Sequence, residues 1–301
     1  GAARGAKPMR IAAHISVAGG VSLAVDRAEA HGCDALQIFC KNASQWRSKP
    51  IDPAEAHRFR TRLADTGLTP AVSHASYLIN LATTAPALRD QSIAALIDEL
   101  DRAEALGLLG VVIHPGTCTG GTEEDALRLI ADALRFALEA RLGLETMILL
   151  EHTAGQGRTV GYRFEHLAAI LTHLDGSPRV GVCLDTCHLL ASGYDIADPS
   201  GFNRTFDDFD RLVGLDRLKL FHANDSKRPC GSRIDRHEHI GKGFVGLEPF
   251  RRLLNDPRFS RLAMLIETEK ANASERAGRI VVDRYDRKNL GTLRRLRATG
   301  P

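Results

Sequence analysis

The sequence predicts an α/β protein, and three observations favour a closed (β/α)8 barrel in a single domain. Short apolar runs alternate with longer amphipathic stretches along most of the 301 residues. This alternation occurs eight times, which is the number of strand and helix units in a (β/α)8, or TIM, barrel. Six consecutive apolar runs end in a histidine or an acidic residue, at the strand ends where such barrels place their active sites. An open, doubly wound sheet is the alternative, because the sequence shows the units but not their closure.

The first four units follow from the spacing of apolar residues. Pro53 lies in the first turn of an expected helix, where its missing N–H costs nothing. Ile93, Leu96 and Leu100 recur at helical spacing on one face of a longer stretch. We therefore expect strands over 9–14, 35–40, 69–74 and 110–116, with helices over 22–31, 53–65, 87–106 and 123–142.

The last four units centre on the stretch 179–195, RVGVCLDTCHLLASGYD. Its apolar run reaches Asp185, and His188 follows three positions later, so we expect a buried strand that opens into a site. We assign no helix between positions 188 and 218, and we expect a long loop over 225–246 before the next helix. The expected strands are 146–153, 179–188, 218–224 and 262–269, and the other helices are 164–174 and 286–297.

Composition and charge exclude several classes of protein. The chain is 44% hydrophobic, which is enough for a full core, and its net charge of +3 does not by itself indicate a nucleic-acid partner. No apolar run approaches the roughly 18 residues of a membrane span. Residues 1–8 are small and basic, so we interpret them as a flexible extension or a cloning remnant before a domain over 9–301, not as a signal peptide.

The six cysteines indicate a reducing compartment. They form no CxxC pair, and several lie within or beside apolar runs. We therefore expect reduced, packed thiols in a cytoplasmic protein. Cys183 and Cys187 could be interpreted as metal ligands, but their four-residue spacing is not typical of a zinc pair.

The strand ends carry a set of metal-binding side chains. A single histidine or acid at a strand end is ordinary, but several buried acids that face one another repel unless cations lie between them. Residues in the adjacent loops extend the set to nine. Five imidazoles and four carboxylates suit zinc, with manganese or iron as poorer fits, and they exceed what one four-coordinate ion can use. The strand-end residues are His74, His114, Glu151, Asp185, His222 and Glu267, and the loop residues are His188, Asp235 and His237.

Charge also indicates what such a cluster would bind. Three divalent cations bring +6 against the −4 of the carboxylates, so a filled site would carry about +2. A phosphodiester is a substrate of matching charge.

Long motifs in the chain resemble the endonuclease IV family of apurinic/apyrimidinic endonucleases. The resemblance runs from about position 9 to 296. It implies a DNA-repair phosphodiesterase, a zinc-dependent deoxyribonuclease of the base excision pathway. Such an enzyme cuts duplex DNA on the 5′ side of an abasic site, leaves a 3′-hydroxyl and a 5′-deoxyribose phosphate, and also acts on 3′-blocked damage. The motifs are HISVAGG, HASYLIN, HPG, EHTAGQG, VGVCLDTCHLLASGYD, HANDSK, DRHEHIGKG and IET.

The resemblance also implies a role for each ligand in a centre of three Zn²⁺ ions, with Mn²⁺ or Fe as an alternative at one position. The first ion would be held by His74, His114 and Glu151. The second would be held by Glu151, Asp185, His222 and Glu267, and the third by His188, Asp235 and His237. A hydroxide bridging two ions at Glu151 would be the nucleophile, because coordination lowers the pKa of bound water toward ~7.

Candidate DNA contacts lie in three loops. Trp46 and Arg47 follow the second expected strand, Tyr77 and Leu78 follow the third, and a basic stretch runs from Lys227 to Arg236. These residues suit backbone contacts and minor-groove wedges, although ordinary packing at the top of the barrel would also explain Tyr77 and Leu78. The stretch NDSK, 224–227, either orients ligands and phosphate or forms a plain turn.

One position departs from the family pattern. Ser44 stands where members of the family commonly carry an arginine that is proposed to fill the gap in the opened base stack. We expect either weaker binding to the lesion, or that the side chain of Gln45 or Arg47 fills the gap instead.

Two rival functions remain open at the level of the sequence. A sugar isomerase or epimerase on the same barrel also uses metals at strand ends, but it has no obvious use for Asp235 and His237. A DNA-binding relative without turnover would be expected to lack a ligand, and all nine are present. We expect a monomer, because a barrel buries its own core.

Overall fold

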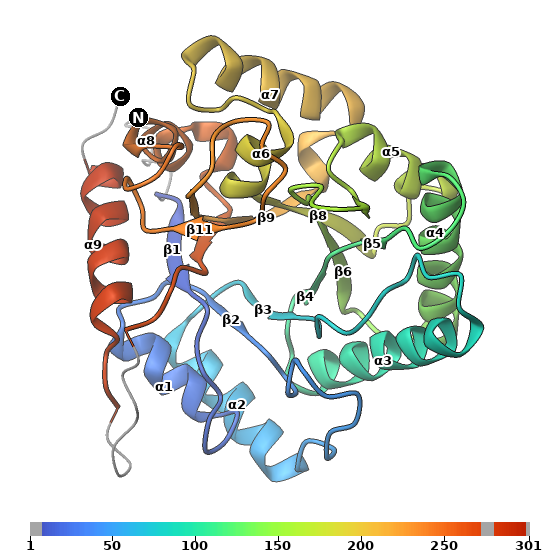
Figure 1. Ribbon diagram of the computed structural model, residues 1–301. Helices are drawn as coiled ribbons and strands as arrows, with labels where there is room; N and C mark the ends of the chain where they lie inside the picture. Colours follow the sequence, from blue (N-terminus) through green and yellow to red (C-terminus); the bar gives the residue numbers. More distant parts are fainter. Residues whose placement is uncertain (1–7, 272–279, 299–301) are drawn as a thin grey trace, which may run out of the picture.

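The computed structural model describes residues 8–271 and 280–298, and eight parallel strands form its centre (Figure 1). The strands follow one another around the sheet in the order β1-β12-β9-β8-β6-β4-β3-β2. A parallel bridge between His14 and Gln37, with the N–H of Ile15 donating to the Gln37 carbonyl at 2.8 Å, joins β1 to β2. The barrel is therefore closed, and the open sheet is excluded. The strands are β1 Arg10–Ala13, β2 Leu36–Ile38, β3 Ala71–His74, β4 Gly110–Ile113, β6 Met147–Glu151, β8 Val180–Asp185, β9 Leu218–His222 and β12 Ala263–Ile266.

Amphipathic helices surround the barrel in chain order (Figure 1). In α4, the Thr122 hydroxyl accepts the N–H of Asp125 while the Asp125 carboxylate accepts that of Thr122, a capping box that starts the helix. The outer helices are α1 Leu23–Ala30, α2 Pro53–Thr66, α3 Pro86–Ala105, α4 Glu123–Ala140, α5 Phe164–His173, α7 Pro199–Leu212, α8 Leu247–Asn255 and α9 Arg284–Ala298. The expected helices are thus present within two residues at each end.

The segment between 186 and 212 differs from the prediction. The expected strand over 179–188 ends at Asp185, because the Asp185 carboxylate accepts the N–H of His188 and begins helix α6, Thr186–Ser192. Helix α7 was not predicted. Its signal is present in the sequence, since Phe202, Phe206 and Phe209 are buried at helical spacing.

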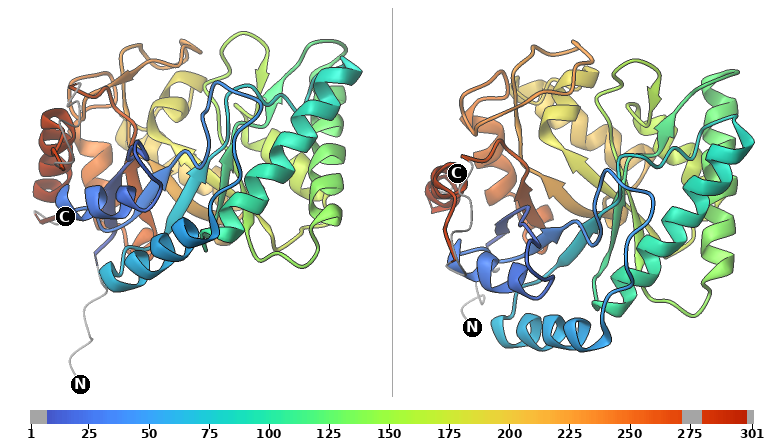
Figure 2. Two further views of the ribbon diagram at one scale, coloured as in Figure 1. Left: turned by 90° about the horizontal axis from the view of Figure 1, so that it is seen from below. Right: turned by 60° about the horizontal axis from the view of Figure 1, so that its bottom comes forward.

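Loops at the carboxyl ends of the strands carry two short antiparallel pairs. One pair joins β5, Gly116–Thr117, to β7, Thr159–Val160, in the loops that follow β4 and β6. The other joins β10, Asp225–Ser226, to β11, His237–Glu238, in the loop that follows β9. Figure 2 shows the loop that carries β10 and β11 rising above one end of the barrel, together with the loops that follow β2 and β4. Two 3₁₀ turns, η1 Leu215–Arg217 and η2 Pro257–Phe259, precede β9 and β12.

The core lies between the strands and the helix ring and continues into the barrel. All six cysteines are free, and five are buried, as expected for packed thiols. Among the described residues, no helix combines the length and apolar character needed to cross a membrane. Residues 1–7, most of the expected extension, lie outside the described part of the chain.

Candidate metal centre

The carboxyl ends of the strands bring the predicted ligands into one cluster. His74, Glu151, Asp185 and His222 are the last residues of β3, β6, β8 and β9. His114 and Glu267 each follow directly after β4 and β12. Because parallel strands end on the same side of the barrel, side chains more than 190 positions apart in the sequence face each other there.

The first group is centred on one oxygen of Glu151. Glu151 Oε2 lies 3.1 Å from His74 Nε2 and 3.0 Å from His114 Nε2. Glu151 and His74 are buried, whereas the side chain of His114 is 34% exposed. Two imidazole nitrogens and a carboxylate oxygen thus converge at the mouth of the barrel.

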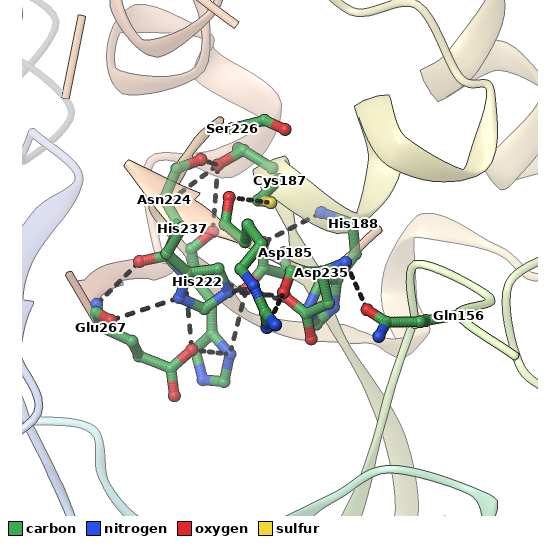
Figure 3. Close-up of polar contacts among 12 residues, drawn as sticks. Gln156, Asp185, Cys187, His188, His222, Asn224, Ser226, Asp235, His237 and Glu267 are labelled. Carbon is green, nitrogen blue, oxygen red and sulfur yellow. Dashed lines mark hydrogen bonds and ion pairs between the residues drawn. The ribbon is translucent and has the colours of Figure 1, made fainter. Parts of the chain in front are cut away.

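The second group combines the other oxygen of Glu151 with Asp185, His222 and Glu267, the last three of which are labelled in Figure 3. His222 Nδ1 lies 3.0 Å from Glu151 Oε1 and 3.0 Å from Glu267 Oε1. Asp185 Oδ2 approaches the same nitrogen at 3.9 Å. Three carboxylates and one imidazole therefore surround a shared point, and Glu151 belongs to both groups.

The third group lies over Asp185. His188 comes from the first turn of α6, which corrects both its expected place at the end of the strand and its grouping with the loop residues. His188 Nε2 lies 3.0 Å from Asp235 Oδ2, and His237 Nε2 lies 3.2 Å from Asp235 Oδ1 and 3.6 Å from Asp185 Oδ2. Asp185 therefore links the second and third groups as Glu151 links the first and second. The Cys187 sulfur also lies near Asp235 and His237.

Backbone carbonyls determine which nitrogen faces the cluster in three of the five histidines. The other ring nitrogens, the Nδ1 atoms of His74, His188 and His237, lie 2.9, 2.7 and 3.2 Å from the carbonyl oxygens of Ala75, His152 and Glu267. A carbonyl oxygen only accepts, so each Nδ1 carries a proton and each Nε2 is left to bind a cation. His152 itself points away from the cluster, toward the Tyr162 carbonyl, as the strand alternation predicts.

Two buried nitrogens test whether the cluster fits metal ions. His188 Nε2 and His237 Nε2 are buried, and each faces an oxygen of the Asp235 carboxylate, at 3.0 and 3.2 Å, without the geometry of a hydrogen bond. With the ring proton on Nδ1, each Nε2 and the carboxylate oxygen that it faces are both acceptors, so a proton or a cation is needed between them as a shared partner. An ion with nitrogen and oxygen ligands would supply that partner, and the three groups fit such ions.

Opposite charges dominate the electrostatics of the cluster. Burial lowers the pKa of His237, but the charge of Asp185 and the contact with Asp235 outweigh it and raise that pKa to about 9. Burial raises the pKa of Glu151, and the charges of the surrounding histidines, His222 first, reverse this and hold the pKa well below its ordinary value. The carboxylates thus draw cations into the site, and protons on the histidines occupy places that metal ions would take.

Two positioning residues extend the predicted set. Gln37 is fully buried in β2, and its side chain lies 2.7 Å from His222 Nε2 through Oε1 and donates to Glu267 Oε2 at 2.8 Å. Its signal is a lone polar residue inside an apolar strand. Asn224 donates to Asp185 Oδ2 at 2.8 Å and accepts the N–H of Glu267, so this part of the NDSK stretch orients two members of the cluster.

The loops after β2 and β3 present the first candidate DNA contacts. Tyr77 is 68% exposed, and its ring centroid lies 5.6 Å from that of His74, at the edge of the cluster. Leu78 and Trp46 are half-buried, and Trp46 packs against the core, while Arg47 is exposed. Tyr77 is therefore free to meet a ligand, whereas Trp46 is anchored to the protein.

A basic pocket beside the cluster contains the other candidates. Lys227 and Arg236 are exposed and line a hollow of about 510 Å³ together with Arg228 and Lys242. One acidic residue, Glu238, is also part of the lining. The local charge is positive although the whole chain is nearly neutral.

The chain matches known proteins over most of its length. The family model described as "Xylose isomerase-like TIM barrel" matches residues 25–285. A protein of Chloroflexus aurantiacus named "Probable endonuclease 4" is 52% identical over 95% of this chain and 98% of its own length. A protein of the same name from a Geobacter species is 47% identical, also over 95% of this chain and 98% of its own length.

Solved structures give the same picture. The crystal structure of endonuclease IV from Thermus thermophilus is 36% identical, with a TM-score of 0.83 over 97% of this chain and 100% of that one. A D-psicose 3-epimerase from Clostridium cellulolyticum has a TM-score of 0.68 at 15% identity, over 96% of this chain and 99% of its own. At that identity the likeness to the epimerase shows a shared fold alone.

Proposed function

Because this chain belongs to the endonuclease IV family, we propose that it hydrolyses the phosphodiester bond on the 5′ side of an abasic site in duplex DNA. The products would be a 3′-hydroxyl and a 5′-deoxyribose phosphate, as in base excision repair, and 3′-blocked ends would be further substrates. The chain would do this with three Zn²⁺ ions, and Mn²⁺ or Fe could replace zinc at one position.

The overlap of the three groups is the observation that carries the proposal. Glu151 presents one oxygen to each of the first two groups, and Asp185 lies between the second and third. A single structural ion would need four ligands, and this cluster contains nine. Shared carboxylates suit a centre of several ions, an arrangement that nucleases and phosphatases use to stabilise the attacking and leaving oxygens at phosphorus.

The ligand chemistry supports zinc. Imidazole nitrogen and carboxylate oxygen are common zinc ligands, and each of the three groups combines both. Zinc ions bound there would act as Lewis acids, lower the pKa of coordinated water and neutralise charge on the phosphate. No side-chain nucleophile is then required.

The residues of the chain itself would position the DNA. Lys227 and Arg236 would bind backbone phosphates beside the cluster, since their side chains are exposed there. Tyr77, next to His74, would contact the unstacked region at the lesion. The carboxylates of Glu151 and Asp185 would keep adjacent ions at fixed places, so that the scissile phosphate is held without reorganisation.

A cleavage assay with metal analysis tests the proposal. The full chain is incubated with a labelled duplex that carries one abasic analogue, beside an undamaged duplex of the same sequence, and its metal content is determined on the same preparation. We expect a nick on the 5′ side of the analogue, an intact undamaged duplex and about three zinc ions per chain. A preparation that contains the metals and leaves the damaged duplex uncut would contradict the proposal.

The same preparation tests the oligomeric state. We propose a monomer, because the upper face of the barrel must stay free for the duplex. Light scattering during gel filtration should give a mass near 32.8 kDa; a stable dimer would contradict this part of the proposal.

A further inference from the structure

The loop between β9 and α8 is closed by one buried carboxylate, that of Asp225. Its Oδ1 accepts the N–H groups of Ser226 and Val245, both at 2.8 Å. Its Oδ2 accepts those of Gly241 and Gly246, at 2.9 and 3.3 Å. Asp225 is fully buried. Three of the four donors lie 16 to 21 positions further along the chain, so one side chain joins the beginning of the loop to its end.

The end of the loop packs tightly against the beginning. A Cβ atom at Gly243 would lie 2.2 Å from the Ser226 carbonyl oxygen and 2.6 Å from Asp225 Oδ1. The N–H of Phe244 also donates to the Ser226 carbonyl at 2.9 Å. A side chain at position 243 would therefore push the two ends of the loop apart.

The same loop carries two members of the third group. Asp225 and Ser226 form strand β10, and Ser226 is the register partner of His237 in β11. The N–H of Lys227 donates to the Arg236 carbonyl at 3.0 Å and extends this hairpin toward Asp235. The position of both ligands therefore depends on a hairpin whose base the Asp225 carboxylate holds.

We infer that Asp225 is a positioning residue for the third metal site, through the loop that it closes and without contact with the ion. This inference rests on the proposed function, since it assumes that Asp235 and His237 bind an ion there. Figure 3 shows Asp235 and His237 beside Asp185 and His188, so the loop must be held against the barrel for the group to form. The first two groups take no ligand from this loop.

A carboxylate is required by the chemistry of its donors. All four partners are backbone N–H groups, and each oxygen of Asp225 accepts two of them. In an Asp225→Asn variant, whichever way the amide is turned, its NH₂ group faces two backbone N–H groups that have lost their acceptor. The loop then opens at its base while the barrel keeps its own hydrogen bonds.

The test measures how tightly each zinc ion is held by the full chain. Wild type and Asp225→Asn are loaded with zinc and titrated with a chromophoric chelator, and retained zinc is counted by mass spectrometry. We expect the variant to release one ion about 10- to 100-fold more readily, as supporting residues of metal ligands generally do when changed. The other two ions should be held as in wild type, and raised free zinc should restore cleavage.

Three further variants make the result specific. His237→Ala removes a proposed third-site ligand and gives the reference pattern for loss of that ion. Gly243→Ala keeps the carboxylate but forces the two ends of the loop apart, so it should show the same zinc loss as Asp225→Asn. If the Asp225→Asn protein does not fold, Gly243→Ala takes its place in the test. Glu104→Gln removes a carboxylate that accepts the N–H of Thr146 in another loop, so it should keep all three ions.

The outcomes separate the inference from the proposed function. Folded Asp225→Asn or Gly243→Ala protein that holds three ions as tightly as wild type would overturn the inference. Equal loss of all three ions from either folded variant would also overturn it. A wild-type chain that binds no zinc and cuts no abasic duplex would instead overturn the proposed function.

Discussion

Replacing Gln37 by leucine should weaken the second metal group without rearranging the barrel. The Gln37 side chain has two described partners in that group, His222 and Glu267. Since its Oε1 faces His222 Nε2, the proton lies on Nε2, and Nδ1 is the nitrogen that faces Glu151 and Glu267. Leucine has a similar volume but neither donor nor acceptor.

The magnitude follows from the contacts that are lost. A buried His222 N–H without an acceptor costs about 1–3 kcal/mol, and a lost hydrogen bond to a charged group such as Glu267 costs about 1.5–3 kcal/mol. Allowing for overlap and relaxation, the metal-free protein should lose about 2–5 kcal/mol of its free energy of unfolding, which lowers its Tm by roughly 3–8 °C. Loss of the fixed His222 orientation should weaken zinc binding about 10- to 100-fold.

Two measurements check these values. Thermal unfolding of the metal-free chain reports the stability change, and competition with a chelator reports the affinity of the second ion. Gln91→Leu is the matched control, because Gln91 is exposed on α3 and should change neither quantity. A folded Gln37→Leu protein with wild-type zinc affinity would refute the argument that Gln37 orients His222.

The remaining predictions concern catalysis, DNA binding and pH. Glu151→Gln should abolish cleavage of abasic duplex and leave the circular dichroism spectrum unchanged, whereas Glu145→Gln at an exposed position should cleave normally; turnover by the first variant would reject the site. Ser44→Arg should tighten binding to abasic duplex at fixed salt, because it adds a guanidinium to an exposed loop; equal affinities would argue against this. Hydrogen bonds from the hydroxyl and N–H of Ser22 lower the pKa of Glu55 to about 2 in the folded chain. The ionised Glu55 therefore contributes fully to stability above its unfolded pKa near 4.5, and this contribution is lost as the pH falls through about 2. Glu55→Gln should therefore lower the Tm at pH 7 and lower it less near pH 3; a difference independent of pH would exclude this linkage.

The sequence by itself determined the eight strand units and the members of the candidate cluster, and it favoured a barrel without showing its closure. Its eight alternating units predict the fold, and residues such as Glu151 and His222 stand at the ends of apolar runs. Parallel strands of a barrel all end on one side, so strand order along the chain is enough to predict that these side chains meet. The resemblance of the long motifs to the endonuclease IV family is confirmed by relatives at about 50% identity.

Only the tertiary structure decided how the cluster is organised. Helix α6 begins at Thr186 because Asp185 caps it, and this local contact overrides the strand expected through His188. The division of Glu151 between two groups and the contacts of Gln37 depend on barrel closure and strand register. Likewise, the hydrogen bond that Asp225 accepts from the N–H of Val245, 20 positions further along the chain, depends on how the loop packs. Apart from the local cap of α6, these contacts join residues far apart in the chain at distances of about 3 Å, and spacing in the sequence carries no information about such distances.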